Sequence, residues 1–246
     1  MTTSANNSIE IVTHCWAGQT DIYAYLLRYQ LSSLFSRTND CWVSITVAYA
    51  KDDPKTVQCL KEMEPLLTTN GVRLVLLPLP HSHLFRRACG RNIAAKQTDA
   101  DVVWFTDCDY LFHNLSLEVA IEECDLDRRC VYYPRTVGAN IDELAGDRLI
   151  ERSRKVHEDW FLADEKLFVP KHYGRAIGGI QIVSGNLARE EGYLEGNERS
   201  KPLEKNVDGF RSCRCDQHYR KAVGKSVAVD IPGVYRIRHT PKGRNL

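Results

Sequence analysis

Two aspartates, Asp107 and Asp109, flank one cysteine directly after the apolar residues 102–105. The chain has two further Asp-x-Asp triplets, which begin at Asp99 and Asp125, so the motif alone is weak evidence. The triplet at Asp107 follows a predicted buried strand, and open α/β sheets bind ligands beyond the carboxyl ends of their strands. Two adjacent carboxylates raise each other's pKa unless a cation neutralises them. The pattern favours Mn²⁺ or Mg²⁺ shared with substrate phosphate, and a solvated acidic loop is the alternative.

Three arginines, Arg86, Arg87 and Arg91, precede this triplet. Residues four apart lie on one face of a helix, so Arg87 and Arg91 are expected to point the same way. A guanidinium group binds phosphate or a nucleobase edge through two parallel hydrogen bonds. The cluster therefore indicates phosphate binding beside the carboxylates, although a solvated helix face gives the same spacing.

The elements that must position these groups follow from the apolar pattern of the first 112 residues. It predicts strands at 9–13, 42–48, 72–77 and 102–105, and helices at 23–34, 54–70 and 85–96. Asp53-Pro54 is typical of an N-cap followed by proline at the first helical position, and Asn70-Gly71 is typical of a helix end. Four strands that alternate with three helices imply an α/β fold of three layers, with a mostly parallel sheet between helices.

The pattern weakens after residue 112. Strands are predicted at 131–133, 180–183 and 226–231, and helices at 141–156 and 216–223. The stretch 185–211 is rich in Gly, Glu, Lys and Asn and predicts a long loop or flap. The pair His81 and His83 follows a proline-rich turn, has no acidic residue close by in the sequence and is interpreted as loop. Because no repeat or linker divides the chain, residues 1–246 are expected to form one domain.

Composition excludes several classes of protein. The 246 residues carry 33 Lys and Arg against 32 Asp and Glu, and 43% are hydrophobic, so the chain is globular and has no global field that attracts nucleic acid. No apolar run reaches the roughly 18 residues of a membrane span, and no secretory signal is evident. The nine cysteines are odd in number and irregularly spaced, which indicates reduced thiols. These features predict a cytoplasmic protein without an integral membrane segment.

The motif order resembles the GT-A glycosyltransferases, most closely the family 2 type. The matching pieces are residues 9–13, 47–53, 88–92 and 102–109, which together cover roughly the first 112 residues. The resemblance implies that residues 1–112 form a nucleotide-binding half and residues 113–246 an acceptor-binding half. It also implies a nucleotide-sugar donor, with a UDP-sugar favoured, and a glycan, lipid-linked or small-molecule acceptor.

The resemblance assigns roles to individual residues of the nucleotide-binding half. Thr13 and either Asp52 or Asp53 correspond to the positions that hold base and ribose. Asp107 corresponds to the aspartate that faces the nucleotide and shares in metal binding, and Asp109 to the metal ligand. Arg91 occupies the family's Arg-Asn position, and Arg87 is expected beside it at the phosphates.

Three features extend the resemblance into the second half. Gly178-Gly179 would let a sugar approach the backbone, although a plain turn also explains the pair. Asp216 corresponds to the general base that deprotonates the acceptor, but Cys215 stands where the family has Glu, and a helix N-cap is the alternative. His239 matches a C-terminal metal ligand by position, and a surface histidine is the alternative.

The function expected from the resemblance is metal-dependent sugar transfer with inversion of the anomeric centre. Transfer with retention stays open, because His239 is followed at a short distance by Lys242-Gly243, as in retaining GT-A enzymes. A domain that binds nucleotide sugars without catalysis also stays open. A phosphatase with an Asp-x-Asp nucleophile is disfavoured, since that class carries the motif after the first strand.

Overall fold

A computed structural model describes residues 7–18, 20–36, 41–113, 115–155, 161–204, 209–210 and 214–241. A sheet of seven strands has the order β10-β6-β9-β4-β1-β2-β3. Its strands are β1 (Ser8–His14), β2 (Trp42–Tyr49), β3 (Val72–Pro78), β4 (Val102–Phe105), β6 (Val131–Pro134), β9 (Gln181–Ser184) and β10 (Ser226–Val229). Strand β9 runs antiparallel to β4 and β6, whereas β1 is parallel to β2 and β4.

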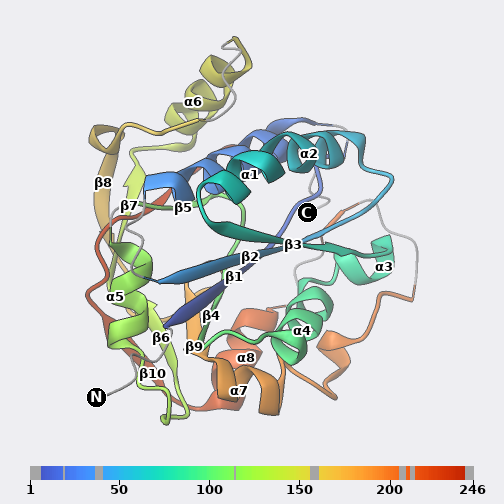
Figure 1. Cartoon of the computed structure of the whole chain (residues 1–246), viewed down its shortest axis with the longest axis vertical. Coiled ribbons are helices and arrows are strands. Elements are labelled where there is room, and N and C mark those ends of the chain that lie inside the picture. Colours follow the sequence, from blue (N-terminus) through green and yellow to red (C-terminus); the bar gives the residue numbers. More distant parts are fainter. Residues whose placement is uncertain are drawn as a thin grey trace.

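Helices cover both faces of this sheet (Figure 1). They are α1 (Ile22–Ser33), α2 (Pro54–Thr69), α3 (His81–Leu84), α4 (Arg87–Gln97), α5 (Ser116–Glu123), α6 (Glu143–Lys155), α7 (Gly185–Glu191) and α8 (Cys215–Val223). Helices α1 and α2 lie on one face, and α4, α7 and α8 lie on the other. The predicted α/β architecture, with a mostly parallel mixed sheet between helical layers, is confirmed.

A second sheet of four strands has the order β5-β11-β7-β8. Its members are β5 (Tyr110–Phe112), β7 (Thr136–Asn140), β8 (Phe168–His172) and β11 (Val234–Arg236). Strand β11 is antiparallel to β5 and parallel to β7, so it joins segments from three distant parts of the sequence. This sheet was not predicted, because strands of three to five residues carry too little periodicity to be recognised.

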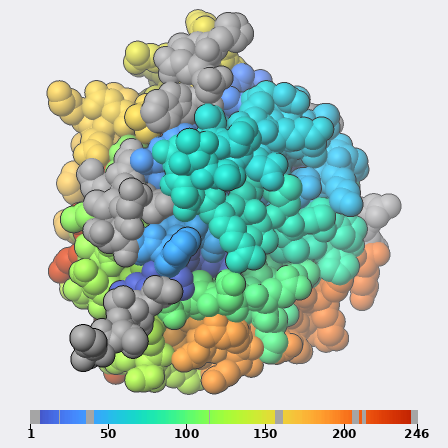
Figure 2. All heavy atoms as spheres, in the orientation of Figure 1, coloured from blue at the N-terminus to red at the C-terminus, as the bar shows by residue number. Residues whose placement is uncertain are grey.

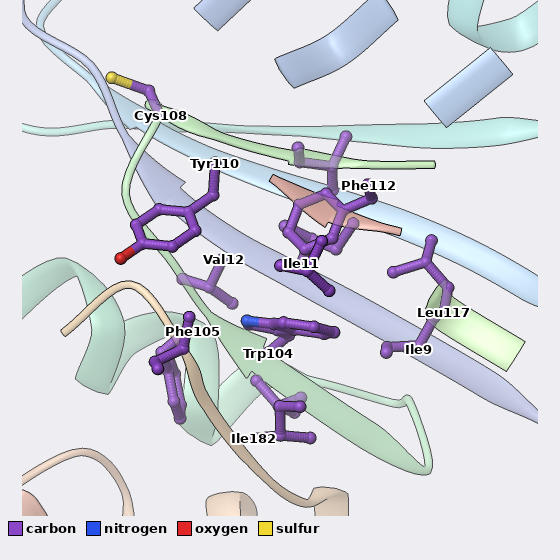
Figure 3. Packing of buried hydrophobic residues seen from close by; sticks show 14 of the residues in the cluster. Ile9, Ile11, Val12, Trp104, Phe105, Cys108, Tyr110, Phe112, Leu117 and Ile182 are labelled. Carbon is purple, nitrogen blue, oxygen red and sulfur yellow. The ribbon is translucent and has the colours of Figure 1, made fainter. Parts of the chain in front are cut away.

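The core beneath the carboxyl edge of the large sheet is closely packed. All four residues of β4 are buried, as expected for a strand covered on both faces. Trp104 meets Phe112 edge to face at a centroid distance of 4.9 Å, and Figure 3 shows Ile11 and Leu117 close to the indole. In the space-filling view, only a small part of β1, in dark blue, reaches the surface on this side of the molecule (Figure 2). The strand that precedes the acidic triplet is therefore a rigid support.

Two predictions of local structure were wrong. The stretch 185–211, expected as a loop, begins with α7 and contains the 3₁₀ turn Glu198–Ser200, although 205–208 and 211 lie outside the described residues. Helix α7 is stable there because the Ser184 hydroxyl accepts a hydrogen bond from the Leu187 amide, as an N-cap does. Residues 81–84, which include His81 and His83 and were expected as loop, form α3, whereas the predicted helix 85–96 is found as α4.

The eight cysteines that the described ranges contain are all buried and have no disulfide partner. Within those same ranges, no helix combines the length and the apolar character that crossing a bilayer would require.

Candidate functional site

The acidic triplet lies in the connection from β4 to β5, just beyond the carboxyl end of β4. Gln30 of α1 fixes this connection, because its side-chain amide donates to the carbonyl oxygens of Asp107 at 2.9 Å and of Tyr110 at 3.0 Å. From the other side, the Ile237 amide donates to the Asp109 carbonyl oxygen at 2.8 Å. The backbone that carries both carboxylates is therefore held at several points.

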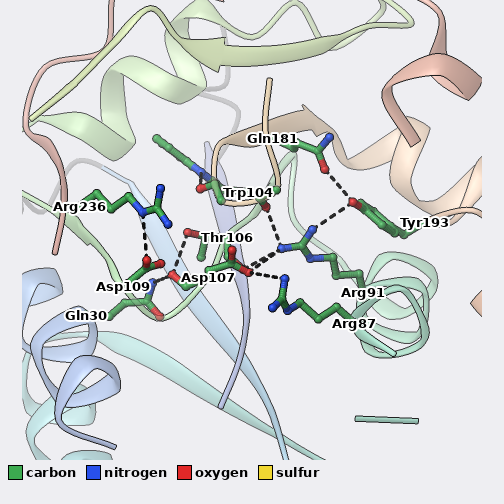
Figure 4. A network of polar contacts seen from close by, with 12 residues as sticks. Gln30, Arg87, Arg91, Trp104, Thr106, Asp107, Asp109, Gln181, Tyr193 and Arg236 are labelled. Atoms are coloured by element: carbon green, nitrogen blue, oxygen red, sulfur yellow. Dashed lines mark hydrogen bonds and ion pairs between the residues drawn. The ribbon is translucent and has the colours of Figure 1, made fainter. Parts of the chain in front are cut away.

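Two arginines of α4 face the Asp107 carboxylate (Figure 4). Arg91 Nη2 lies 3.3 Å and Arg87 Nη1 lies 3.9 Å from Asp107 Oδ1. Arg91 is 1% exposed, and its guanidinium also donates to the carbonyl oxygens of Thr106 and Gly178. Burial by itself lowers the pKa of Arg91, but Tyr193 and Asp107 outweigh burial and leave it above its ordinary value. Arg91 thus stays charged inside the protein, whereas Arg87 is partly exposed at the site.

Asp109 is buried and carries both a cationic partner and an unsatisfied oxygen. Arg236 of β11 donates from Nε to Asp109 Oδ2 at 3.0 Å. The pKa of Arg236 is raised, chiefly because of the Asp109 charge. Asp109 Oδ1 is buried and has no hydrogen-bond partner among the described residues. An unsatisfied buried carboxylate oxygen is costly, so its presence indicates a partner that binds in the functional state.

Asp107, Asp109 and His239, the three residues proposed from the sequence as metal ligands, line the same small pocket. The other lining residues are His14, Trp16, Tyr23, Arg87, Cys108 and Phe210. The pocket measures about 20 Å³, which is on the order of the space that one water occupies. It has room for an ion but not for a nucleotide, so a larger ligand requires side chains around it to move.

The pocket fits a divalent cation that takes most of its ligands from water and substrate. Within the described ranges, no group of three or more His, Cys, Asp and Glu side chains is placed so that it forms a cage able to hold a metal ion. Mg²⁺ and similar hard cations rarely use such cages in phosphate-binding sites and need one or two carboxylates there. The unsatisfied Asp109 Oδ1, with Asp107 and His239 beside it, meets that requirement.

Asp216 lies in the first turn of α8, close to Asp107. A methyl group placed on Gly178 would lie 3.6 Å from Asp216 Cβ and 3.9 Å from Asp107 Oδ2, so these two residues border the same small space. Arg214 precedes the helix in a left-handed conformation and provides no side-chain cap. Asp216 is therefore brought to the site although it comes from the second half of the chain.

The residues predicted to hold base and ribose do not line this pocket. Thr13 is fully buried, and its hydroxyl has no hydrogen-bond partner in the described part of the chain. Asp52 is exposed, and its Oδ1 lies 3.0 Å from His81 Nε2, so His81 has an acidic partner that the sequence did not reveal. His81 in turn packs edge to face against Trp16, at a centroid distance of 4.7 Å.

Asp53 is buried, and its carboxylate is bonded within the protein. It caps α2, accepts from the Ala17 amide at 2.7 Å and accepts from the Thr56 hydroxyl at 2.6 Å. These bonds tie the loop after β1 to the start of α2.

Sequence reasoning missed three residues that shape the site. Gln30 and Gln181 are polar residues inside apolar runs, a signal that predicts a buried hydrogen-bonding role. The third is His14, which follows Thr13 in the sequence, is 4% exposed and lines the pocket. Its pKa is well below the ordinary value because of burial and the charges of Arg91 and Arg87, so the ring is neutral.

No protein-family model matches the sequence, and no curated protein matches it either. Solved structures do match. GalNAc-T7 in complex with UDP, GalNAc and Mn²⁺ is similar with a TM-score of 0.58 and 12% identity, over 96% of this chain and 45% of that chain. The S. aureus protein TarS is similar with a TM-score of 0.53 and 12% identity, over 93% of this chain and 36% of that chain.

A third structure is the mannosyltransferase PcManGT from Pyrobaculum calidifontis in complex with GDP-Man and Mn²⁺. Its TM-score is 0.50 at 12% identity, over 97% of this chain and 59% of that chain. The chain has the GT-A fold. It spans between 36% and 59% of the length of these three GT-A proteins. At this identity the likeness establishes the fold, and the function must be argued from the site.

Proposed function

We propose that the chain is a metal-dependent glycosyltransferase, which moves a sugar from a nucleoside diphosphate donor to a hydroxyl acceptor. One observation carries the proposal: Asp109, whose Oδ1 is buried and unsatisfied among the described residues, lines a pocket with Asp107 and His239 beyond the carboxyl end of β4. The GT-A neighbours with bound UDP or GDP-Man and Mn²⁺ support it. A UDP-sugar is the favoured donor, and the acceptor is a glycan, a lipid-linked sugar or a small molecule.

Asp109 and His239, with Asp107, would hold Mn²⁺ or Mg²⁺. When bound, the ion stabilises the negative charge that grows on the leaving diphosphate. Arg87 is the partly exposed guanidinium at the site and would bind a phosphate oxygen through its forked N–H groups. Residues 1–112 therefore supply the nucleotide side of the site in this proposal.

Asp216 would act as general base in the half formed by residues 113–246. A carboxylate within hydrogen-bond reach of the acceptor hydroxyl accepts its proton as the new glycosidic bond forms. Attack from the face opposite the diphosphate inverts the anomeric centre. NMR of the first product anomer tests this stereochemistry, and a retained configuration would remove Asp216 from the role of base in direct displacement.

Base and ribose binding is assigned to Thr13 and Asp52. The Asp53 carboxylate is less suited to ribose, since its oxygens already accept the Ala17 amide and the Thr56 hydroxyl. Asp52, which is exposed and near Trp16 through His81, is the better candidate for contact with the nucleotide.

The proposal is tested by turnover and melting temperature with a panel of UDP- and GDP-sugars, with and without Mn²⁺. We expect one donor to raise the melting temperature only with Mn²⁺, because a ligand that binds the folded state stabilises it. Asp109→Ala should lower donor turnover by about 100-fold or more, as expected for loss of a metal ligand.

The matched control is Asp99→Asn. Asp99 belongs to another Asp-x-Asp triplet, and its carboxylate is 81% exposed beside Arg73, so turnover should stay unchanged. Full activity of Asp109→Ala would refute the metal assignment. Donor binding without any turnover by the wild type would indicate a non-catalytic sugar-nucleotide-binding protein instead.

A further inference from the structure

A chain of hydrogen bonds leads from Asp107 through Arg91, Tyr193 and Gln181 to the backbone of Asp216, and Figure 4 shows the part from Asp107 to Gln181. Arg91 contacts Asp107 through Nη2 and donates from Nη1 to the Tyr193 hydroxyl at 3.0 Å. The Tyr193 hydroxyl donates to Gln181 Oε1 at 2.7 Å, and Gln181 Nε2 donates to the Asp216 carbonyl oxygen at 3.0 Å. Three side chains thus connect the donor-side carboxylate to the first turn of α8.

The three side chains of this relay are inaccessible to water, whereas its two end bonds, to Asp107 and to the Asp216 carbonyl oxygen, are partly buried. Gln181 and Tyr193 are fully buried and Arg91 is 1% exposed. A buried group that loses its partner cannot recover the bond from solvent, so the bonds along the relay depend on one another. Gln181 is further fixed by its place in β9, where it pairs with Phe105 at the end of β4.

The direction of every bond in the relay is determined. Arg91 has only donors, so Tyr193 must accept from it and can donate only onward to Gln181. Burial raises the pKa of Tyr193 well above its ordinary value, so the hydroxyl keeps the proton it donates. The amide of Gln181 is then oriented with its nitrogen toward Asp216. Only this arrangement of donors and acceptors makes every hydrogen bond of the relay.

The two carboxylates that the relay connects border one small space. Gly178 lies between them, and its carbonyl oxygen accepts from Arg91 at 2.8 Å. A reaction between two bound substrates needs its catalytic groups held within a fraction of an ångström of the productive geometry. Asp107 comes from the connection between β4 and β5, and Asp216 from α8, so no single element fixes their separation.

We propose that Arg91, Tyr193 and Gln181 form a positioning relay that fixes the Asp216 base relative to the donor-binding Asp107. This inference rests on the proposed function. Tyr193 and Gln181 contact neither donor nor acceptor in this scheme. They set the rate of transfer by holding the residues that do.

Two variants interrupt the relay at different points. Tyr193→Phe removes the central hydroxyl and releases both ends, so kcat for transfer should fall by about 30-fold or more and donor KM should rise severalfold. Gln181→Met keeps the Arg91–Tyr193 bond and releases only the Asp216 side. It should lower kcat by about tenfold and leave donor KM within about twofold of wild type. The double variant should be little worse than Tyr193→Phe, because both residues act through one chain.

Tyr219→Phe is the matched control. The Tyr219 ring stacks on Tyr193 at a centroid distance of 4.1 Å, and its buried hydroxyl has no hydrogen-bond partner within the described ranges. The Tyr219→Phe variant removes a buried tyrosine hydroxyl beside Tyr193 and breaks none of the hydrogen bonds of the relay. The relay is overturned if Tyr193→Phe loses no more kcat than Tyr219→Phe, or if the losses of the Tyr193 and Gln181 variants multiply.

Hydrogen–deuterium exchange tests the positioning without requiring turnover. In Tyr193→Phe, the backbone amides near Asp107 and those in the first turn of α8 should both exchange about fivefold faster or more, because a shared restraint has been lost. In Tyr219→Phe neither segment should change. Unchanged exchange at either segment in Tyr193→Phe would overturn the relay. If the two variants show this exchange pattern but the wild-type protein turns over no donor, the proposed function is overturned and the relay remains.

Discussion

At the scale of single residues, Asp52 and Asp53 are adjacent acids with opposite surroundings. Asp53 is 1% exposed, caps α2 and accepts a hydrogen bond from Ala17 in the loop after β1. Asp52 is exposed beside His81. Of these two adjacent aspartates, Asp53 therefore has a structural role and Asp52 is a candidate for ligand binding.

Asp53→Ala should destabilise the protein by about 2–4 kcal/mol, because it removes an N-cap and leaves buried donors unpaired. Urea unfolding measures this loss. Asp52→Asn, the control, should change stability by less than about 0.5 kcal/mol and lower donor affinity severalfold. If Asp53→Ala kept full stability but lost donor binding, the two roles would have to be exchanged.

Glu10 is a buried acid in the middle of β1, remote from the candidate site. Burial raises its pKa above the ordinary 4.5, and the Thr46 hydroxyl donates to its Oε1 at 2.5 Å. As pH rises above 4.5, the unfolded chain ionises this group while the folded protein keeps it protonated. The stability that protonated Glu10 contributes is therefore complete below pH 4.5 and is lost as pH rises through its folded pKa.

Glu10→Gln should therefore stabilise the protein at neutral pH and not at acidic pH. The gain should grow by at most about 1.4 kcal/mol per pH unit above the ordinary pKa, until the folded pKa is passed. Chemical unfolding of wild type and variant at several pH values measures it. The exposed Glu122→Gln should show no such trend, and a gain that is independent of pH would contradict the explanation.

The sequence predicted which residues of the candidate site lie together better than it predicted the contacts that each one makes. Asp107, Asp109 and His239 were expected together, and they line one pocket. Arg91 was expected at the phosphates, but its guanidinium is buried and bonded to Tyr193, Thr106 and Gly178. Residue type and spacing identify a charge but not its exposure, so a direct contact between Arg91 and nucleotide stays a prediction.

At the scale of elements, Gly178 and Gly179 are neighbouring glycines between the site and β9 that face different surroundings. A methyl group on Gly179 would lie 2.0 Å from the Tyr110 ring, inside the core. A methyl group on Gly178 would meet its nearest neighbour, Asp216 Cβ, at 3.6 Å, which is an ordinary contact. A methyl group on Gly178 therefore leaves the fold undisturbed, and it occupies the space between the carboxylates of Asp107 and Asp216.

Gly178→Ala should keep the wild-type melting temperature within about 2 °C and lower transfer kcat/KM by about tenfold, because it narrows the site without straining the core. Gly179→Ala should lower stability by about 1–3 kcal/mol through overpacking. Thermal melting and steady-state kinetics on both variants separate the effects. Wild-type kinetics for Gly178→Ala would place the sugar elsewhere.

The elements of the first half were predictable because their signals are local. The strands near 9–13, 42–48 and 72–77 were predicted to within about two residues, and Asp53-Pro54 begins α2 as expected. The second sheet was not predictable, since β11 is stabilised by pairing with β5 and β7, far away in the sequence. Propensity describes a short strand poorly, because partners rather than composition decide its state.

At the scale of the whole molecule, the chain has the GT-A fold although no family model and no curated protein matches its sequence. Folds persist while most residues change, since the pattern of buried apolar positions matters more than their identity. This is why alternation of strands and helices was enough to predict the architecture. The comparison structures have much longer chains, so their acceptors give no direct guide to the acceptor of this one.

Charge is also organised at this scale. The chain as a whole is nearly neutral, with a net charge of +1, yet Arg87, Arg91 and Arg236 converge on Asp107 and Asp109. A neutral surface with a local cluster of arginines favours a small anionic ligand over a long polyanion.

The ion pair between Asp109 and Arg236 spans 127 positions of the sequence. During synthesis, the acidic triplet leaves the ribosome long before β11 does. A nascent chain that has reached only α8 holds Asp107 and Asp216 but lacks the strand that completes β5, the guanidinium that balances Asp109, and His239. The candidate site therefore cannot be completed before residues 236–239 have been synthesised and β11 has paired with β5 and β7.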